Sequence, residues 1–392
     1  MFLAKDEINN LVEAKFDEIV ALRRQLHRFP EISGKEFNTQ GTILTDLQKL
    51  GLEPQSIAGT GVIVNIRGSR PGKKVAIRAD MDALPINDEC GQSYQSQNQG
   101  VCHACGHDGH MAIVLGVARV LKQLKNDFPG EVRLLFQPSE EAGPGGARDL
   151  IEAGALAGVD YIIGAHLWQP LQAGTIGISY GRMLAAVGKF TIKILGKGGH
   201  GSLPHQTVDP ILVGTQLALA LHTIVSRNID PLEATVLSLG MLRAGDTFNI
   251  IPDTAVLEGT VRCFEQTVMD LIFQRIDDLA KGICTAYGAD YRLERSQGPS
   301  ALKNVPEVVN FIQAAGQKVL GKENVIEVQP VMISDDYALY LQQVPGAYFF
   351  VGSGNSQKGI GYPHHHPKFD IDETSLKYGV EIMTRAALKL LA

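Results

Sequence analysis

The 392-residue sequence lacks the features that mark secreted and membrane proteins. It has only five cysteines, an odd number, and no stretch of about 18 uncharged apolar residues that could cross a bilayer. Its first residues, MFLAKDEINNLVEAKF, carry acids where a signal peptide needs an apolar core. We therefore expect a cytoplasmic protein in a reducing compartment, with no membrane partner.

Runs of basic residues are also missing. The 36 Lys and Arg residues are outnumbered by 42 Asp and Glu residues, so the net charge is −6, and the pI is near 6.0. This balance predicts no nucleic acid partner. The composition, 44% hydrophobic and 20% charged, is ordinary for a globular protein. The length exceeds the size at which single cores stop growing, so two domains are expected.

The densest chemistry lies in one short segment, VCHACGHDGH. Its potential ligands are Cys102, His103, Cys105, His107, Asp108 and His110. Apolar residues at helical spacing follow, from Met111 to Ala118, so the cluster is predicted on the loop and first turn of a partly buried helix. Thiol, imidazole and carboxylate groups together favour a divalent metal site that recruits further ligands from distant parts of the chain.

The same segment contains a C-x-x-C pair, which has two other interpretations. A structural zinc site of four cysteines needs a second pair, whereas Cys90, Cys263 and Cys284 stand alone. A redox pair is expected with few histidines around it, and here three share the segment. The metal site is favoured, and a thiol-disulfide protein remains the non-hydrolytic alternative.

Several predicted strands are followed by residues that bind metals. Buried strands are predicted at 75–77 and 132–136, and another before His166. The residues at their ends are Asp80, Asp82, Glu140, Glu141 and His166. Each alone has a simpler explanation, as a turn-capping acid, a solvated acidic turn or a structural histidine. Their repetition at the carboxyl ends of strands is typical of α/β active sites.

The pattern of elements changes near residue 185. Residues 186–299 read as strand, helix, strand, strand, helix, strand, which predicts a ferredoxin-like α+β sandwich. Helix and strand alternation surrounds this segment on both sides. We predict an α/β catalytic domain, with a central mixed sheet flanked by helices, from residues 1–185 and 300–392, interrupted by an inserted domain at 186–299. Near the end, the segment HHHP is too internal for an expression tag, and it predicts a loop that supplies a metal ligand.

With these residues assembled, the chain resembles a family of two-metal amidohydrolases. The family includes hippurate hydrolase, N-acyl-amino-acid amidohydrolases (aminoacylases), bacterial carboxypeptidases and plant auxin-conjugate hydrolases. The matching segments, in order, are RRQLHRFPE, RADMDALP, HACGHDGH, QPSEE, GKGGHGSLPH, NIIPD, GTVR and HHPKFDIDE. RADMDALP with HACGHD resembles the branch in which a cysteine replaces a metal-ligating aspartate.

The resemblance implies two divalent ions per subunit, Zn, Mn, Co or Ni. The implied ligands are Cys105, His107, Glu141, His166 and His365. Asp82 would orient a ligand, and Asp80 stands where other branches carry a ligating histidine. The last ligand stays open among His364, His365 and His366, with His365 matching the family spacing.

Further roles are implied by the same resemblance. Glu140 would be the general base on a water that bridges the two ions. The inserted domain would serve as a lid and dimerisation domain, in a homodimer or a dimer-based oligomer. Within it, His200 would contact the reacting carbonyl, while Asn249 and Arg262 would grip a substrate carboxylate.

These implications lead to a cytoplasmic, metal-dependent hydrolase of N-acyl-L-amino acids. Arg262 can hold a carboxylate through two parallel hydrogen bonds, which favours a substrate with a free amino-acid carboxylate. The alternatives within this chemistry are a carboxypeptidase or dipeptidase acting on short peptides, and an N-acetyldiaminopimelate deacetylase. A non-catalytic metal-binding protein is the alternative from another class.

Overall fold

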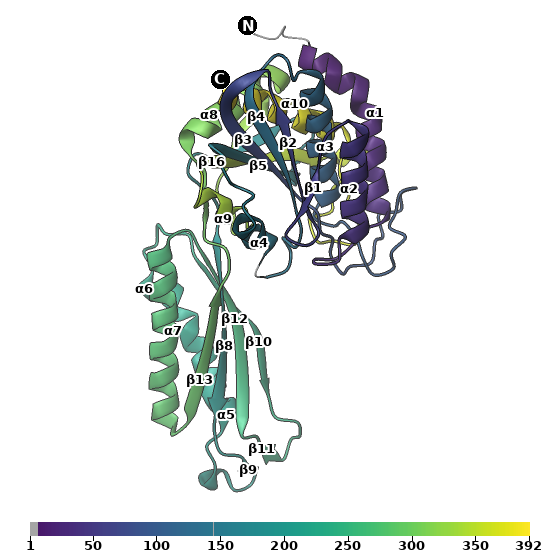
Figure 1. The fold of residues 1–392 in the computed structure, drawn as a ribbon. Coiled ribbons are helices and arrows are strands. Elements are labelled where there is room, and N and C mark those ends of the chain that lie inside the picture. Colours follow the sequence, from purple (N-terminus) through teal and green to yellow (C-terminus); the bar gives the residue numbers. More distant parts are fainter. Residues whose placement is uncertain (1–6, 144) are drawn as a thin grey trace. The chain divides into compact units, whose positions relative to one another are not determined.

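The computed structural model describes residues 7–143 and 145–392. The chain divides into two compact units (Figure 1). Unit 1 comprises the chain up to Met183, Lys303–Gln329 and Asp336–Ala392. Unit 2 comprises Leu184–Leu302 and Pro330–Asp335.

Unit 1 is built on an eight-stranded mixed sheet. In spatial order its strands are β1 (Gln55–Ile57), β2 (Gly61–Arg67), β4 (Pro129–Gln137), β3 (Arg70–Asp80), β5 (Tyr161–Gln172), β16 (Gly346–Gly354), β6 (Ile176–Ile178) and β15 (Val325–Glu327). The central strands β4, β3, β5 and β16 are parallel, whereas β2 runs antiparallel to β4. The carboxyl ends of the parallel strands therefore share one edge of the mixed sheet.

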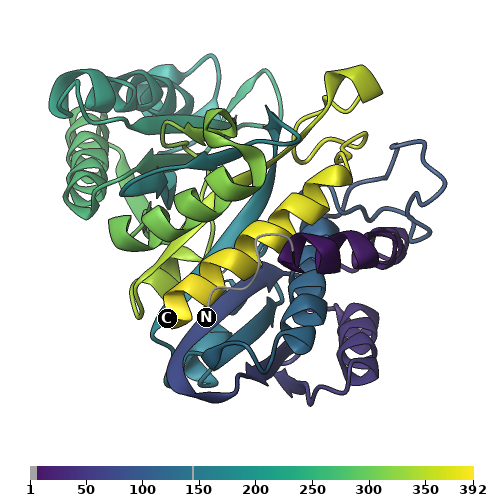
Figure 2. The same cartoon turned by 90° about the horizontal axis from the view of Figure 1, so that it is seen from above.

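Helices cover this sheet. They are α1 (Glu7–Arg28), α2 (Phe37–Lys49), α3 (His107–Gln123), α4 (Gly146–Glu152), α8 (Pro306–Leu320), α9 (Ala338–Leu341) and α10 (Thr374–Leu391). Helices α3 and α10 pack on β3 and β5, and α1 lies against both helices (Figure 2). The prediction that α3 is only partly buried is wrong. The sheet covers one side of α3, and α1 and α10 pack against it, so every residue from His107 to Leu121 is buried.

The position of His166 also differs from the prediction. It lies in the middle of β5, and not at the end of a strand. Pairing of β5 with β3 stops at Gly164, but pairing with β16 continues through His166 to Trp168 and beyond. The strand is therefore longer than the hydrophobic run that predicts it, because a neighbour on its other side supplies hydrogen bonds.

Unit 2 is an α+β sandwich. Its sheet has the order β10 (Val236–Ala244), β12 (Thr254–Cys263), β8 (Ala186–Leu195) and β13 (Asp290–Gln297), with every neighbouring pair antiparallel. Its helices are α5 (Pro210–Leu221), α6 (Thr223–Asn228) and α7 (Gln266–Tyr287). Along β12 the side chains alternate between buried and half-buried, so α5 and α7 cover one face. This is the ferredoxin-like arrangement expected from the order of elements.

Short strands complete the second unit and its junctions. Strand β9 (Gly199–His200) pairs with β11 (Ile250–Ile251), and β7 (Arg182–Leu184) pairs with β14 (Leu302–Lys303). The segment Pro330–Asp335 clusters with unit 2 because the Ala185 N–H donates to the carbonyls of Val331 and Ile333. The inserted domain predicted at residues 186–299 does not contain this segment.

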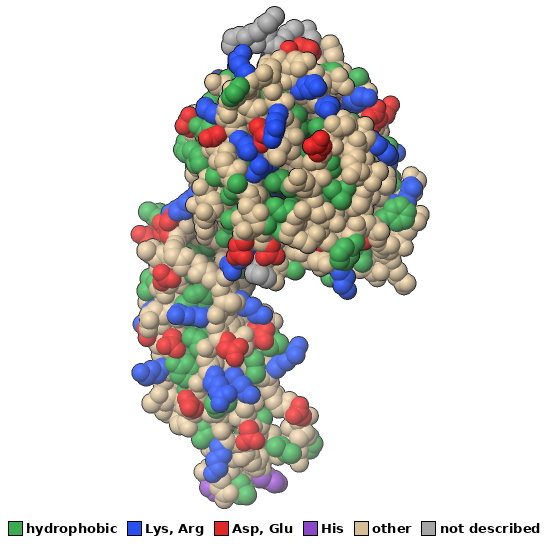
Figure 3. Space-filling view, in the orientation of Figure 1, with side chains coloured by type: hydrophobic (Ala, Val, Ile, Leu, Met, Phe, Trp, Pro, Cys, Tyr) green, Lys and Arg blue, Asp and Glu red, His purple; other side chains and the backbone are tan. Residues whose placement is uncertain are grey.

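The visible surface of each unit carries charges of both signs, interspersed with apolar and neutral side chains (Figure 3). None of the helices in the described part of the chain is long and apolar enough to cross a membrane.

Candidate metal centre and active site

Unit 1 brings together metal-type side chains from four distant segments. They are Cys105 and His107 at the start of α3, Glu140 and Glu141 in the loop after β4, His166 in β5, and His365 in the loop before α10. Three groups have ligand atoms that all lie within 4.8 Å of one another: Cys105, His107 and His166; Cys105, Glu141 and His365; His107, Glu140 and Glu141. Because the groups overlap, one small volume can hold more than one ion.

Hydrogen bonds on the outer side of each ring direct the histidines. His107 Nδ1 lies 2.8 Å from the carbonyl oxygen of Asp82, and His166 Nδ1 lies 2.8 Å from that of Leu167. A carbonyl can only accept, so each Nδ1 carries a proton, and in the neutral ring each Nε2 keeps a lone pair. Nε2 of His166 lies 3.4 Å from Cys105 Sγ. Both rings therefore present a ligand atom to the cluster, as metal-binding histidines do.

The Asp82 carboxylate holds the backbone of the glutamate pair. Its Oδ1 accepts from the Glu140 N–H and its Oδ2 from the Glu141 N–H, each at 3.0 Å. Ser33 Oγ donates to Oδ2 at 2.6 Å. Burial raises the pKa of Asp82, but hydrogen bonds from His107, Ser33 and the Glu141 N–H outweigh it and keep the pKa below its usual value. His107 contributes most to this lowering. Asp82 thus positions Glu140 and Glu141 through their backbone N–H groups.

Burial dominates the pKa shifts of Cys105 and His166, although the neighbouring Asp80 and Cys105 raise the pKa of His107 against its effect. It raises the pKa of the Cys105 thiol well above its usual value, with Glu141 adding to the effect. It also lowers the pKa of His166, helped by the neighbouring His110 and His364. A neutral imidazole is ready to bind a metal, whereas a buried thiolate next to carboxylates needs a cation beside it.

Two buried polar atoms of the cluster indicate that its residues fit a metal ion. In the described part of the chain, His107 Nε2 and Glu141 Oε1 lie 3.9 Å apart and have no hydrogen-bond partner, because His365 Nε2, 3.2 Å from Glu141 Oε1, does not have hydrogen-bond geometry. Leaving buried polar atoms unsatisfied is costly, and it is typical of a site whose partner is an ion. Imidazole nitrogens, a thiol and carboxylates form a suitable donor set for borderline-soft divalent metals. The residues present therefore fit two divalent ions.

The three consecutive histidines have different surroundings. His364 Nε2 lies 2.9 Å from the Leu167 carbonyl, and its ring stacks on Trp168. His366 Nδ1 accepts from the Lys368 N–H, and its ring stacks on Tyr362. His365 alone of the three lies beside Glu141, with Nε2 3.2 Å from Oε1. Its backbone has φ +63° and is held by its N–H donating to Ala104 O, next to Cys105.

Other residues of the histidine-rich segment are already engaged. His110 Nε2 accepts from the Leu167 N–H, so its Nδ1 proton goes to Asp80 at 2.6 Å. Asp80 also accepts from Arg78 Nη1 at 2.6 Å, and its Oδ2 lies 3.7 Å from His107 Nε2. Asp80 therefore supports the cluster from beside it. Cys102 is a buried free thiol whose pKa is raised by burial, which makes a redox role for it unfavourable.

The three predicted substrate residues lie in unit 2. The Ser202 N–H donates to His200 Nδ1 at 3.0 Å, so the ring carries its proton on Nε2 as a free donor. His200 is opposite Ile250 in the β9–β11 pair, and the Gly201 N–H donates to the carbonyl of Asn249. His200 and Asn249 are thus neighbours, and both are exposed.

Arg262 lies near the end of β12. Its Nη1 donates to Thr260 Oγ1 at 2.7 Å and to the Val261 carbonyl. Burial lowers its pKa, and among the described residues no carboxylate forms an ion pair with it. The guanidinium group is therefore half-buried with a charge that its own unit does not neutralise.

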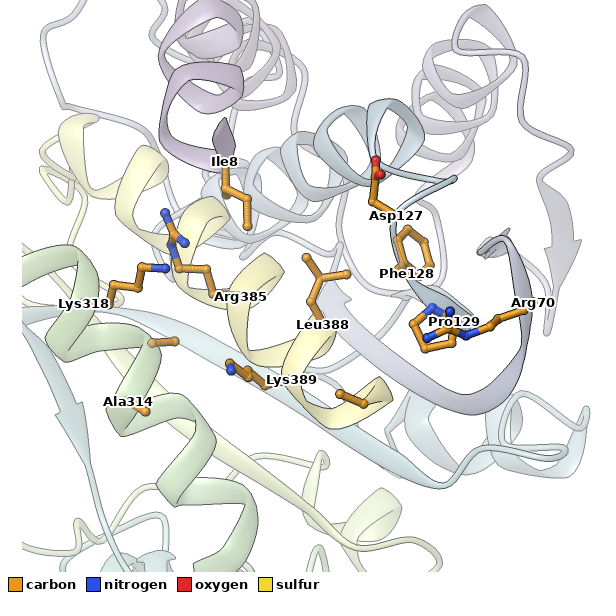
Figure 4. A pocket seen from close by; sticks show the side chains of 12 residues that line it. Ile8, Arg70, Asp127, Phe128, Pro129, Ala314, Lys318, Arg385, Leu388 and Lys389 are labelled. Atoms are coloured by element: carbon orange, nitrogen blue, oxygen red, sulfur yellow. The ribbon is translucent and has the colours of Figure 1, made fainter. Parts of the chain in front are cut away.

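A separate cavity of about 350 Å³ lies elsewhere in unit 1 (Figure 4). Arg70, Phe128, Lys318 and Arg385 are among the residues that line it. Strands β3 and β4 begin at Arg70 and Pro129, so the cavity lies at the end of the sheet opposite to the metal-type cluster. None of the predicted site residues lines it.

Comparison with known proteins agrees with this geometry. Residues 76–389 match peptidase family M20/M25/M40. An N-acyl-L-amino acid amidohydrolase of Geobacillus stearothermophilus is 46% identical over 306 residues, which are 78% of this chain and 83% of the relative. Thermostable carboxypeptidase 1 of Saccharolobus solfataricus is 40% identical over 390 residues, 98% of each chain.

A solved structure shows the same fold. The YxeP protein of Bacillus subtilis, a dinuclear metal binding peptidase from the M20 family, superposes with a TM-score of 0.85 at 32% identity, covering 97% of this chain and 99% of that chain. The family match extends over most of the sequence and includes every residue of the metal-type cluster. The chain therefore belongs to peptidase family M20/M25/M40, and it is a metal-dependent amidohydrolase of that family.

Proposed function

We propose that the protein hydrolyses N-acyl-L-amino acids to a carboxylate and a free amino acid, with Glu140 as general base. The observation that carries the proposal is the group of His107, Glu140 and Glu141, whose ligand atoms lie within 4.8 Å of one another. One glutamate is then close enough to act on a water at the metal site while the other binds the metal. The relative from Geobacillus stearothermophilus is named for this reaction.

The proposed ligands are Cys105, His107, Glu141, His166 and His365. When bound, a pair of divalent ions lowers the pKa of a water and polarises the substrate carbonyl. Glu140 takes the proton of the attacking water and returns it to the departing nitrogen. Asp82 keeps Glu140 and Glu141 in place through their N–H groups. Zn, Mn, Co and Ni are the candidate metals.

His200 suits the stabilisation of the reacting carbonyl. Its Nε2–H is a donor because Nδ1 already accepts from Ser202. A donor aimed at the developing oxyanion lowers the barrier to amide hydrolysis. Asn249 offers an amide NH₂ group beside it, since its Oδ1 accepts from Thr247 Oγ1 at 3.2 Å.

Arg262 is proposed to bind the substrate carboxylate. It cannot do so beside the same chain's His200. In the ladder Thr254 is opposite Leu195 and Arg262 is opposite Val187, so eight residues of β12 separate the two ends, and at about 3.3 Å per residue this is on the order of 25 Å. His200 lies beyond the Leu195 end (Figure 1). An N-acyl amino acid is much shorter, so we propose that two copies of the chain supply these residues to one site.

Unit 2 has surfaces suited to such a dimer. Strand β10 is at the edge of the sheet and pairs only with β12 among the described strands. The adjacent helix α5 exposes Leu212 and Leu219, at 46% and 69%, on one face. An unpaired strand edge beside an apolar helix face favours a twofold interface. We propose a homodimer formed through β10 and α5.

A substrate panel tests the proposal. Acetyl, benzoyl and longer acyl derivatives of several amino acids would be compared with dipeptides, using enzyme of measured metal content. Turnover of one acyl group across many amino acids, with close to two ions per chain, is expected. Activity set by the C-terminal residue, regardless of what precedes it, would instead identify a carboxypeptidase. That second candidate is favoured by the match to thermostable carboxypeptidase 1 over 98% of both chains.

A further inference from the structure

The loop between β4 and α4 carries both Glu140 and Glu141, and three buried carboxylates hold it from outside. Asp82 binds its middle. The other two, Glu36 and Asp336, come from parts of unit 1 that are remote in the sequence, and neither belongs to the metal-type cluster. Their side chains are 0% and 2% exposed.

Asp336 joins the two ends of this loop. Both of its carboxylate oxygens lie 2.8 Å from Gln137 Nε2, at the last residue of β4. Its Oδ2 also accepts from the Ala147 N–H at 3.0 Å, in the first turn of α4. One side chain therefore sets the separation between the points where the loop begins and ends.

Glu36 holds the loop next to the glutamate pair. Its Oε1 accepts from the Ser139 N–H at 2.9 Å, and its Oε2 accepts from Thr60 Oγ1 at 2.7 Å. Ser139 directly precedes Glu140 and has φ +55°, a conformation that is unfavourable for a residue with a side chain. Such a backbone persists only where its surroundings hold it.

A series of buried hydrogen bonds and ion pairs connects Asp336 to His110 and to strand β5 next to His166. Arg78 donates to Asp336 Oδ1 at 3.0 Å and to Asp80 at 2.6 Å. Asp80 in turn accepts from His110 Nδ1, and His110 accepts from the Leu167 N–H, next to His166. The glutamate loop and strand β5 are thus fixed relative to one another through fully buried groups.

We propose that Asp336 and Glu36 are positioning residues that aim the Glu140 and Glu141 carboxylates and thereby set metal affinity. The inference rests on the proposed function, because it takes Glu141 as a ligand and Glu140 as the base. Outer partners of metal ligands typically change metal affinity or activity by 10–100-fold when they are removed. Asp336 acts on both ends of the loop, so its loss affects both glutamates.

Asp336→Asn tests the inference directly. The variant keeps one acceptor oxygen but places an NH₂ group against Gln137 Nε2 in either orientation, and also against either Arg78 Nη2 or the Ala147 N–H. We expect about 10–100-fold weaker binding of one metal ion by the apoprotein, measured by chelator competition. We also expect a changed absorption spectrum of the Co²⁺-loaded protein, and a lower kcat with little change in KM.

Glu381→Gln is the matched control for a buried carboxylate. Glu381 pairs with Arg385 within α10 and touches neither the loop nor the cluster. This variant should lose stability without a change in metal affinity or in the Co²⁺ spectrum. Equal metal affinities and identical spectra for Asp336→Asn and Glu381→Gln would overturn the inference.

Gly145→Ala provides a second test if Asp336→Asn does not fold. Gly145 has φ +89°, and a Cβ there would lie 2.4 Å from Asp336 Oδ2, so the change presses on the same anchor from the loop. Gly143→Ala is its control, because a Cβ at Gly143 meets nothing within 4 Å. Only Gly145→Ala should weaken metal binding; equal metal affinities in the two variants would contradict the inference.

Glu141→Gln separates the two levels of the argument. If Glu141→Gln loses metal but the Asp336 and Gly145 variants do not, the positioning role is wrong and the proposed ligand stands. If Glu141→Gln also keeps both ions with unchanged affinity, the ligand assignment fails, and the positioning role fails with it.

Discussion

Glu140 and Glu141 are chemically identical neighbours whose environments differ. Both N–H groups donate to Asp82, which leaves the two side chains free to take different directions. Glu141 Oε1 is buried beside His107 and His365, as expected for a ligand. At the scale of the residue, this difference in surroundings supports the proposal that Glu141 is the ligand and Glu140 the base.

Exchanging each glutamate for glutamine should separate these roles. Glu140→Gln should retain both ions and lose several orders of magnitude in kcat, because a neutral isostere cannot shuttle the proton. Glu141→Gln should lose metal. Metal content per chain and kcat, measured on the same preparations, check both variants. Metal loss in the first variant with full content in the second would reverse the assignment.

In the proposed function, Arg262 is the residue on which substrate class depends most. Arg262→Ala should reduce kcat/KM for N-acyl amino acids by the equivalent of about 2–5 kcal/mol, the cost of leaving a buried charge unpaired. The loss should be small for the matching N-acyl amino acid amides, which have no carboxylate. Equal losses on both substrates would show that Arg262 supports the sheet instead, since it also contacts Thr260.

At the scale of the element, α1 is fixed by a polar network around His27. His27 Nδ1 lies 2.8 Å from Asp108 Oδ2, and Nε2 lies 3.2 Å from Asp88 Oδ2. Despite burial and the nearby Arg23, these carboxylates raise the pKa of His27 well above its usual value. Asp88 also accepts from the N–H groups of Cys90 and Ser96. His27 therefore packs α1 against the segments that carry Asp88 and Asp108.

Asp88→Asn should lower the free energy of unfolding by about 1–3 kcal/mol at pH 6, the cost of disturbing a buried hydrogen-bonded group. The pKa of Asp88 is lowered by His27 against the effect of burial, so its contribution is complete above the unfolded pKa near 4 and is lost as the pH falls. The difference from wild type should shrink below about pH 4, as measured by urea unfolding.

Glu18→Gln is the control for this titration. Glu18 pairs with Lys15 on the exposed side of α1, and such surface pairs contribute about 0–1 kcal/mol. A difference for Asp88→Asn that stays constant down to pH 3 would show that its hydrogen bonds depend on shape and not on charge.

The elements themselves were largely predictable. Hydrophobic periodicity placed α3 and the strands of unit 2, because apolar residues recur there at helical or alternating spacing. The complete burial of α3 and the length of β5 were not predictable, since each depends on a neighbour from the end of the chain, α10 and β16.

At the scale of the whole molecule, the proposed site needs two copies of the chain. A Glu140→Gln subunit still carries a sound His200, and a His200→Ala subunit still carries a sound Glu140. Mixing the two inactive variants under conditions of subunit exchange should restore one working site per heterodimer. Activity should approach half of the wild-type value per heterodimer.

Leu219→Lys controls for the interface itself. A charge on the exposed face of α5 should shift the protein to monomers in sedimentation experiments and abolish the complementation. Leu232→Lys, at a residue that is 90% exposed outside the helices, should leave both unchanged. A mixture that stays inactive despite proven heterodimers would place His200 in its own chain's site or outside catalysis.

The sequence by itself determined the chemistry and the family, because the ligand types of HACGHD, the adjacent glutamates and the order of the motifs are local features. Tertiary structure decided which atoms are available. His364 and His110 are hydrogen-bonded to the backbone of Leu167, whereas His365 lies beside Glu141. Tertiary structure also brought Asp336 to Gln137 across 199 residues of sequence. A hydrogen-bond partner so distant leaves no periodic or local signal, so only the folded chain shows which residues hold the glutamate loop.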